Sequence, residues 1–145
     1  MTEDQDFKCP CCSGQSYQDC CCIYHQGKEP KNALDLMRSR YSAYALNNVE
    51  YIVRTTHPRH PAVSQNLQKW KEEILNFSLN TDFEELEILD FKEQSDRATV
   101  VFIAHLKQGD EELSFTERSF FAKTEERWLY VNGDVFAGEH RDLKA

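Results

Sequence analysis

Hydrophobic positions along the chain change their period near residue 80. Before that point apolar side chains recur every three or four residues, as they do on one face of an amphipathic helix. This pattern predicts three helices, over residues 33–47, 48–55 and 64–77. Asn32 and Ser64 are predicted to cap the first and the third of them. From residue 83 apolar and polar residues alternate, which predicts four strands, over residues 84–93, 97–107, 112–123 and 127–136.

Polar turn residues separate the predicted strands, so we expect an antiparallel meander. The turns are Gln94-Ser95-Asp96, Gln108-Gly109-Asp110 and Thr124-Glu125-Glu126. The stretch VVFIAHL, residues 100–106, is apolar on both faces and is expected at the centre of the sheet, covered on both sides. Helices followed by a meander predict an α+β domain. A long bent sheet wrapped round three helices resembles the cone of the nuclear transport factor 2-like (SnoaL-like) fold, which has a pocket at its mouth.

All six cysteines lie between Cys9 and Cys22, in two groups separated by a short polar loop. Two thiolates from each group would supply the four tetrahedral ligands of a structural Zn²⁺ site. The spacing leaves the ligand set open, because Cys9 can pair with Cys11 or with Cys12, and His25 could replace a cysteine. A disulfide framework and an iron–sulfur cluster are the alternatives. Adjacent cysteines bridge each other poorly and no signal peptide is visible, so zinc and a reducing, cytoplasmic compartment are favoured.

Length and charge narrow the classes of function. A chain of 145 residues fits one domain with an appendage, and we expect a zinc knuckle over residues 1–30 followed by an independent cone over residues 31–145. Residues 1–7 and 138–145 are polar and are expected to be loose. No apolar run is long enough to span a membrane. The net charge of -8 argues against nonspecific binding to nucleic acid.

Arg40 falls inside the apolar arc of the first predicted helix, where an unpaired buried charge would be costly. Its guanidinium therefore either reaches solvent or a structural carboxylate, or lines a cavity with a polar mouth. The candidate pocket residues are Arg40, Tyr41, Tyr44, His57, Glu117 and Arg118. If the protein is an enzyme, an isomerase, cyclase or dehydratase is expected, with Arg40, His57 and Arg118 around one enclosed pocket. If it is a binding module, the pocket holds a small ligand.

Two sets of motifs resemble known proteins. The segment CPCCSGQSYQDCC, residues 9–21, resembles the SEC-C zinc motif, although Cys12 stands where that motif usually has glycine. The resemblance implies that the zinc ligands are Cys9, Cys11, Cys20 and Cys21. Together with this motif, the segments LMRSRYSAYAL, THP, TERSFF and WLYVNG resemble the bacterial YchJ family.

The resemblance also implies a fold, a cofactor and partners. In the YchJ family a SEC-C motif precedes a nuclear transport factor 2-like domain, and the zinc is structural. SEC-C motifs elsewhere contact a chaperone and the ribosome, which implies a protein-docking surface around the metal. The candidate docking residues are Lys8, Tyr17, Tyr24, His25 and Lys28. Exposed sheet faces of this fold often pair, so a homodimer is a further candidate assembly.

Overall fold

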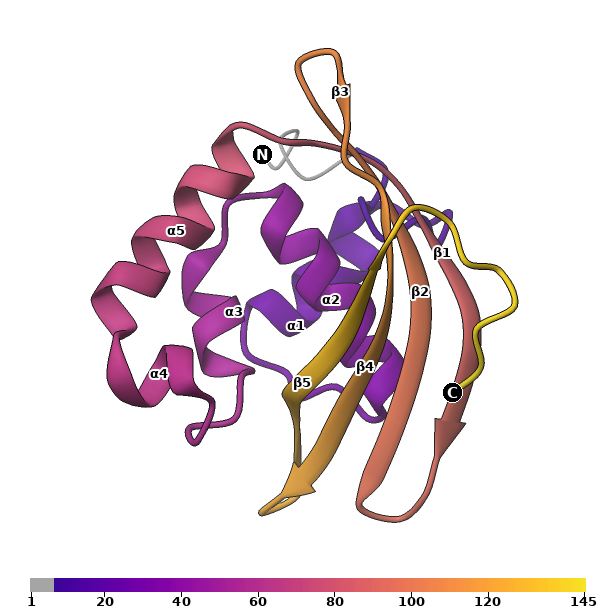
Figure 1. Ribbon diagram of the computed structural model, residues 1–145. Coiled ribbons are helices and arrows are strands. Elements are labelled where there is room, and N and C mark those ends of the chain that lie inside the picture. The colour runs from indigo at the N-terminus through magenta and orange to yellow at the C-terminus, as the bar shows by residue number, and fades with distance from the viewer. Residues whose placement is uncertain (1–6) are drawn as a thin grey trace.

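A cone of helices held in a curved antiparallel sheet forms most of the molecule (Figure 1). The computed structural model describes residues 7–145. The helical elements are the 3-10 helix η2 (Tyr17–Asp19), α1 (Cys21–His25), α2 (Ala33–Ala45), α3 (Val49–Arg54), α4 (Pro61–Gln65) and α5 (Leu67–Leu79). The strands are β1 (Asp82–Glu93), β2 (Arg97–Gln108), β3 (Glu111–Glu112), β4 (Phe115–Thr124) and β5 (Arg127–Ala137). The fold is therefore the α+β, nuclear transport factor 2-like cone that the sequence predicts.

Side-chain caps define where α2, α3 and α4 begin. The Asn32 side chain accepts a hydrogen bond of 2.8 Å from the Asp35 N–H and starts α2 where predicted. The region before α5 differs from the prediction. Ser64, expected as a cap, lies inside the short helix α4, and α5 starts after Asn66 instead. The helix α4 is not among the predicted helices, because its five residues are too few to show a helical period.

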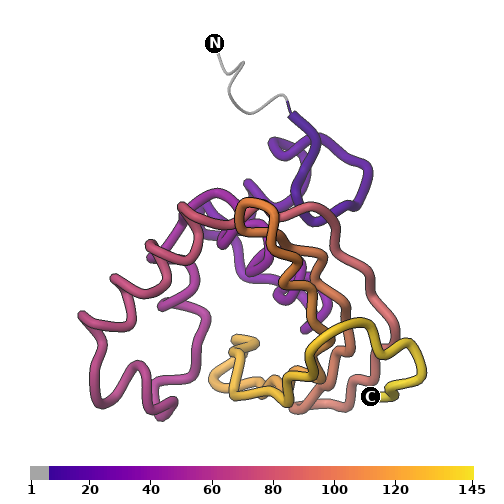
Figure 2. Tube along the Cα trace, turned by 45° about the horizontal axis from the view of Figure 1, so that its top comes forward, coloured from indigo at the N-terminus to yellow at the C-terminus, as the bar shows by residue number. Residues whose placement is uncertain are grey.

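The four predicted strands form one sheet in the order β1-β2-β4-β5, with β3 paired to β2. The strand β2 lies inside the sheet as predicted. The predicted third strand is shorter than expected, because residues 111–112 pair back with the end of β2 and β4 starts only at Phe115. Register shifts in β1 and between Phe120 and Phe121 mark bulges, which bend a sheet. The helices lie on the concave side of the bend (Figures 1 and 2).

The C-terminal segment, residues 138–145, covers part of the convex face of the sheet, on the side of β1 (Figure 1). The Arg118 Nε donates to the Lys144 carbonyl at 2.9 Å, and the Ala145 N–H donates to Asp90 at 2.9 Å. Val101 and Ile103, on this face of β2, are fully buried. The expectation that this segment is loose is therefore wrong, whereas the expected cover on both faces of β2 is confirmed.

Residues 7–27, here called the finger, pack against one side of α2. The Cys9 Sγ lies 3.4 Å from the Ser42 hydroxyl, and Arg38 Nη1 donates to the Cys11 carbonyl at 2.9 Å. The buried hydrophobic core continues from the finger cysteines into the cone without a break. The cone therefore shares its core with the finger and is not packed independently of it.

Two further expectations concern the ends and the surface of the chain. Residues 1–6 of the expected loose N-terminal segment lie outside the described residues. Its last residue, Phe7, stacks on the Tyr17 ring with centroids 5.2 Å apart and belongs to the finger. Among the helices of the described part of the chain, none has the length and apolar character needed to cross a membrane.

Candidate functional site

Four thiols meet at the centre of the finger. The sulfur atoms of Cys9, Cys11, Cys20 and Cys21 all lie within 4.8 Å of one another. The Cys11 and Cys20 sulfurs are 3.6 Å apart. Zn–S bonds of about 2.3 Å in a tetrahedron place neighbouring sulfurs about 3.8 Å apart, so this donor set fits a tetrahedral metal ion. All six cysteines are free, so they do not form the alternative disulfide framework.

The backbone of the first turn selects Cys11 and turns Cys12 away. Cys12 has a φ of 67°, and its N–H donates to the Cys9 carbonyl at 3.1 Å. Its side chain is exposed and lies beside β1, where the Cys12 Sγ accepts from the Leu86 N–H at 3.4 Å. Cys22, the sixth cysteine, is buried in the core beside the cluster. The geometry thus brings together the four cysteines that the SEC-C resemblance implies.

The protonation of the cluster shows why it favours a cation. Hydrogen bonds from Cys11 and Cys21 hold the pKa of Cys9 far below that of a free thiol. Hydrogen bonds to Cys11 and Cys9 raise the pKa of Cys21 far above that of a free thiol. Burial raises the pKa of Cys20 to about 11. Without a cation the thiols must therefore keep protons between them, whereas a divalent ion replaces those protons and binds all four thiolates.

Two of the five predicted docking residues, Tyr24 and His25, contact α2, and a third, Tyr17, is buried within the finger. The Tyr17 hydroxyl donates to His25 Nδ1 at 2.6 Å, and His25 Nε2 donates to the Ser39 carbonyl of α2 at 2.8 Å. The Tyr24 hydroxyl donates to Asp35 at 3.3 Å. Of the predicted set, Lys8 and Lys28 are exposed. These residues therefore do not form one solvent-facing surface, and His25 is not a member of the metal cluster.

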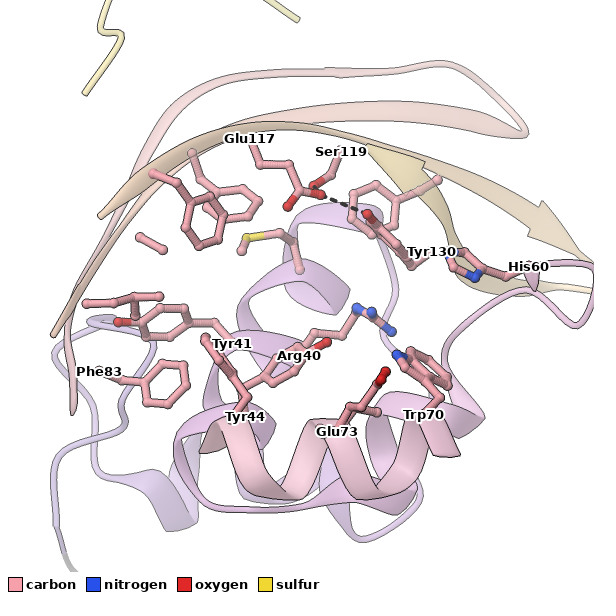
Figure 3. A pocket seen from close by; sticks show the side chains of 18 residues that line it. Arg40, Tyr41, Tyr44, His60, Trp70, Glu73, Phe83, Glu117, Ser119 and Tyr130 are labelled. Carbon is pink, nitrogen blue, oxygen red and sulfur yellow. Dashed lines mark hydrogen bonds between the residues drawn. The ribbon is translucent and has the colours of Figure 1, made fainter. Parts of the chain in front are cut away.

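A second site lies inside the cone, where α2 and α5 face the concave side of the sheet (Figure 3). It is a cavity of about 400 Å³. Aromatic and aliphatic side chains form most of its wall: Met37, Tyr41, Tyr44, Trp70, Ile74, Phe77, Phe83, Phe102, Ala104, Leu106, Phe115, Phe121 and Tyr130. Its polar side chains are Arg40, His60, Glu73, Glu117 and Ser119.

Arg40 is the buried cation of this cavity, with 7% of its surface exposed. Its Nη1 donates to the Thr55 and Thr56 hydroxyls at 2.8 and 2.9 Å and to the Ile52 carbonyl at 3.2 Å. Its guanidinium lies over the Tyr130 ring, 4.5 Å from the centroid. No carboxylate of the described residues forms an ion pair with it. The charge is thus held by neutral groups and faces the cavity (Figure 3).

Glu117 supplies a carboxylate on the sheet side of the same cavity. Its Oε2 accepts from the Ser119 hydroxyl at 2.7 Å and from the Tyr130 hydroxyl at 2.9 Å. Burial and the nearby Glu117 raise the pKa of Tyr130 far above that of a free phenol. Burial, and then the charge of Arg40, lower the pKa of His60, which stacks on Trp70 at the edge of the cavity. At neutral pH both Tyr130 and His60 are therefore uncharged.

Four of the six predicted pocket residues line this cavity, namely Arg40, Tyr41, Tyr44 and Glu117. The other two do not. Arg118 points to the convex face, where its Nη1 lies 3.6 Å from Asp134, and His57 lines a separate surface depression beside Arg59. The structure therefore does not bring Arg40, His57 and Arg118 together, as the expected enzyme site would require.

Five further lining residues with a side-chain nitrogen or oxygen atom were not among the predicted pocket residues: His60, Trp70, Glu73, Ser119 and Tyr130. For two of them the sequence pattern indicates the side on which the residue lies. Ser119 is two positions from Glu117 on one strand and so must face the same side. Trp70 lies on the apolar face of the helix predicted over residues 64–77, which indicates that it points inward. The others depend on tertiary placement.

The fold and the cysteine cluster define a class of protein, a nuclear transport factor 2-like domain with an N-terminal SEC-C-type finger. A family model described as "YchJ, middle NTF2-like domain" matches residues 32–133. A UPF0225 protein of Haemophilus influenzae (strain PittEE) is 40% identical over 131 residues, which are 88% of this chain and 78% of that protein. The chain belongs to the YchJ family.

Solved structures agree with this assignment. The solution structure of a SEC-C motif containing protein from Rhodopseudomonas palustris is 37% identical, with a TM-score of 0.76, and covers 87% of this chain and 96% of its own. The crystal structure of a SEC-C motif containing protein from Psychrobacter arcticus is 29% identical, with a TM-score of 0.74, and covers 94% of this chain and 87% of its own.

Proposed function

We propose that this protein binds a small ligand in the cone and that a structural zinc ion in the finger holds the cone in its binding shape. The observation that carries the proposal is the cavity of about 400 Å³ with a buried Arg40 that lacks an ionic partner among the described residues. Ligand pockets in proteins are mostly apolar, with a few polar groups that fix orientation, and commonly measure about 300–1,000 Å³. The cavity fits this description.

The cysteine cluster supports a structural role for the ion. Cys9, Cys11, Cys20 and Cys21 would complete a four-coordinate shell and leave no position for water or a substrate. All four are sulfur donors, which suit zinc. Such an ion supplies folding free energy and no chemistry of its own. It fixes the finger against α2, the helix that carries Arg40 into the cavity.

The polar groups of the cavity favour binding over catalysis. The Nδ1 of His60 accepts from the Ala62 N–H, and His60 and Glu117 form no hydrogen bond with each other among the described interactions. General acid–base catalysis needs a positioned proton donor or acceptor with a suitable pKa. Tyr44 and Tyr130 have a raised pKa because they are buried, which makes them poor bases at neutral pH.

Toluene provides a direct test, because the chain has one tryptophan at the cavity and one outside it. We expect toluene to shift the indole N–H NMR signal of Trp70 and to leave that of the buried Trp128 unchanged. Ala104→Phe should abolish the shift, because it places a ring inside the cavity wall. Ala122→Phe, outside the cavity, is the matched control and should keep it. An unchanged Trp70 signal, or a shift that survives Ala104→Phe, would contradict the proposal.

A further inference from the structure

Arg40 has hydrogen-bond donors that the protein does not use. A guanidinium carries five N–H donors, and the described hydrogen bonds of Arg40 all come from Nη1. Its Nε and Nη2 have no acceptor among the described residues, and neither is one of the fully buried atoms that lack a partner. Both nitrogens therefore keep accessible surface, and the guanidinium that carries them faces the cavity (Figure 3). A carboxylate is the group that matches two neighbouring guanidinium donors.

Glu117 has an unused acceptor in the same cavity. Both of its described hydrogen bonds end on Oε2, so Oε1 is open to accept from a ligand. The sheet makes room for this carboxylate at Gly133, because a Cβ there would collide with Glu117 and lie 3.0 Å from the Tyr130 hydroxyl. Two hydroxyl donors thus hold the carboxylate in place, and the absence of a side chain at Gly133 leaves room for it. A ligand N–H or ammonium group fits it.

The charges select among small molecules. Arg40 is the one permanent cation in the wall of the cavity, and two carboxyl side chains, Glu117 and Glu73, share that wall. A phosphate would bring two negative charges to one cation and would be repelled by the nearby carboxyl groups. An amine without an acid group would leave the charge of Arg40 without a partner and would be repelled by it. A single carboxylate balances Arg40, and one ammonium balances Glu117.

We propose that the cavity binds a small zwitterionic acid of the amino-acid type, with its carboxylate on Arg40, its ammonium on Glu117 and an aromatic or aliphatic body against the phenylalanine-rich wall. The proposal rests on the proposed function, since it names the class of ligand for the same cavity. The volume of about 400 Å³ accommodates a free amino acid or a similarly small metabolite.

Four probes with one phenyl ring separate the contributions: L-phenylalanine, phenylacetate, phenethylamine and toluene. Their dissociation constants can be measured from the Trp70 indole signal. We expect L-phenylalanine to bind about 10- to 100-fold more tightly than toluene, because hydrogen bonds to charged groups have about that effect. If toluene binds and the charged probes bind no better, the ligand class is wrong and the proposed function stands. If no probe binds, both fail.

Variants then assign each charge to its residue. Arg40→Met should weaken phenylacetate by about 10- to 100-fold and spare phenethylamine, and Glu117→Gln should do the reverse. Thr55 and Thr56 keep hydrogen bonds to backbone carbonyls without Arg40, so the variant can fold. Gly133→Ala should weaken phenethylamine without changing any charge, because it displaces the Glu117 carboxylate.

Matched controls separate contact from general electrostatics. Arg59→Met removes a cation from the neighbouring depression, and Glu72→Gln removes an exposed carboxyl group of α5 that does not line the cavity. Neither should change the preference between phenylacetate and phenethylamine. Equal effects of Arg40→Met and Arg59→Met, or of Glu117→Gln and Glu72→Gln, would overturn the assignment. If Arg40→Met does not fold, the comparison of probes on the unmodified protein still decides the ligand class.

Discussion

Cys12 shows how one backbone angle chooses a metal ligand. The chain has adjacent thiols at Cys11 and Cys12, and the spacing of the sequence allows either to join Cys9. The left-handed backbone at Cys12, with φ of 67°, turns its sulfur toward β1, while the Cys11 sulfur points into the cluster. The choice depends on local conformation, which residue types and spacing do not reveal.

We predict that Cys11→Ser loses the bound metal and that Cys12→Ser retains one ion per chain. The hydroxyl of serine is a poor ligand beside three thiolates, whereas Cys12 lies outside the cluster. Native mass spectrometry with elemental analysis measures both the number and the identity of the ions. Metal retained by Cys11→Ser and lost by Cys12→Ser would establish the Cys9–Cys12 pairing instead.

Glu87 makes the stability of the protein depend on pH. Hydrogen bonds from Arg141 and His105 lower its pKa to about 2. In the unfolded chain this carboxyl group takes up its proton near its ordinary pKa of 4.5, before the folded protein does. The unfolded state therefore binds more protons, and stability falls as the pH drops from about 4.5 toward 2.

We predict that Arg141→Met moves the midpoint of acid unfolding to higher pH, by a small amount because Arg141 is half exposed. Circular dichroism along an acid titration measures the midpoint. Lys69→Met is the control, because it removes an exposed cation that forms no ion pair among the described residues. Equal midpoints for Arg141→Met and the unmodified protein would show that the ion pair does not contribute to stability.

Among the elements, the hairpin between β4 and β5 is locally strained. Its two-residue loop, Glu125-Glu126, has positive φ at both positions, 51° and 67°. This conformation is that of a type I′ turn, which asparagine and glycine adopt with little cost. A left-handed residue other than glycine costs about 1–2 kcal/mol. The sequence predicted a turn at this place, although glutamate gives no sign of the conformation.

We predict that replacing Glu125-Glu126 by Asn-Gly raises the free energy of unfolding by about 1 kcal/mol. Urea unfolding followed by circular dichroism measures the change. The same replacement at Ser95-Asp96, where neither residue has a positive φ, is the control and should not stabilise the protein. A gain at both turns would point to a general effect of the glycine rather than to relief of strain.

The elements also show which parts of the fold follow from local sequence. The period of apolar residues located α2, α3 and the four long strands, because their buried side chains recur with the spacing of a helix or a strand. It missed α4, which is short, and the packing of residues 138–145, which use ion pairs and backbone hydrogen bonds in place of apolar side chains. Strand alternation also forbids Glu117 and Arg118 from facing the same cavity.

At the scale of the whole molecule, the finger and the cone share one core. Cys9 contacts Ser42, Arg38 binds the Cys11 carbonyl, and the cluster of buried residues crosses the boundary between them. The boundary near residue 30, read from the sequence, separates two segments of the chain and not two packed bodies.

We therefore predict that removing the metal with a strong chelator lowers the stability of the entire protein by several kcal/mol, since structural zinc sites contribute about 10–16 kcal/mol in small peptides. The fluorescence of Trp128, which is buried in the cone, and circular dichroism should report a single transition at a lower temperature. Zinc added back should restore it. An unchanged cone transition after chelation would mean that the finger folds and unfolds separately.

The helix α2 contacts the finger on one side and lines the cavity on the other. Arg38 and Ser42 point to the finger, and Arg40 and Tyr44 line the cavity. Under the proposed function, the zinc ion in the finger and the ligand in the cavity both act on α2. If binding of one changes the affinity for the other, thermodynamic reciprocity requires the reverse effect to be the same factor. If that factor increases both affinities, a chelator should remove the zinc ion more slowly when the cavity holds a ligand. The thirteen residues of α2 would then couple metal binding in the finger to ligand binding in the cone.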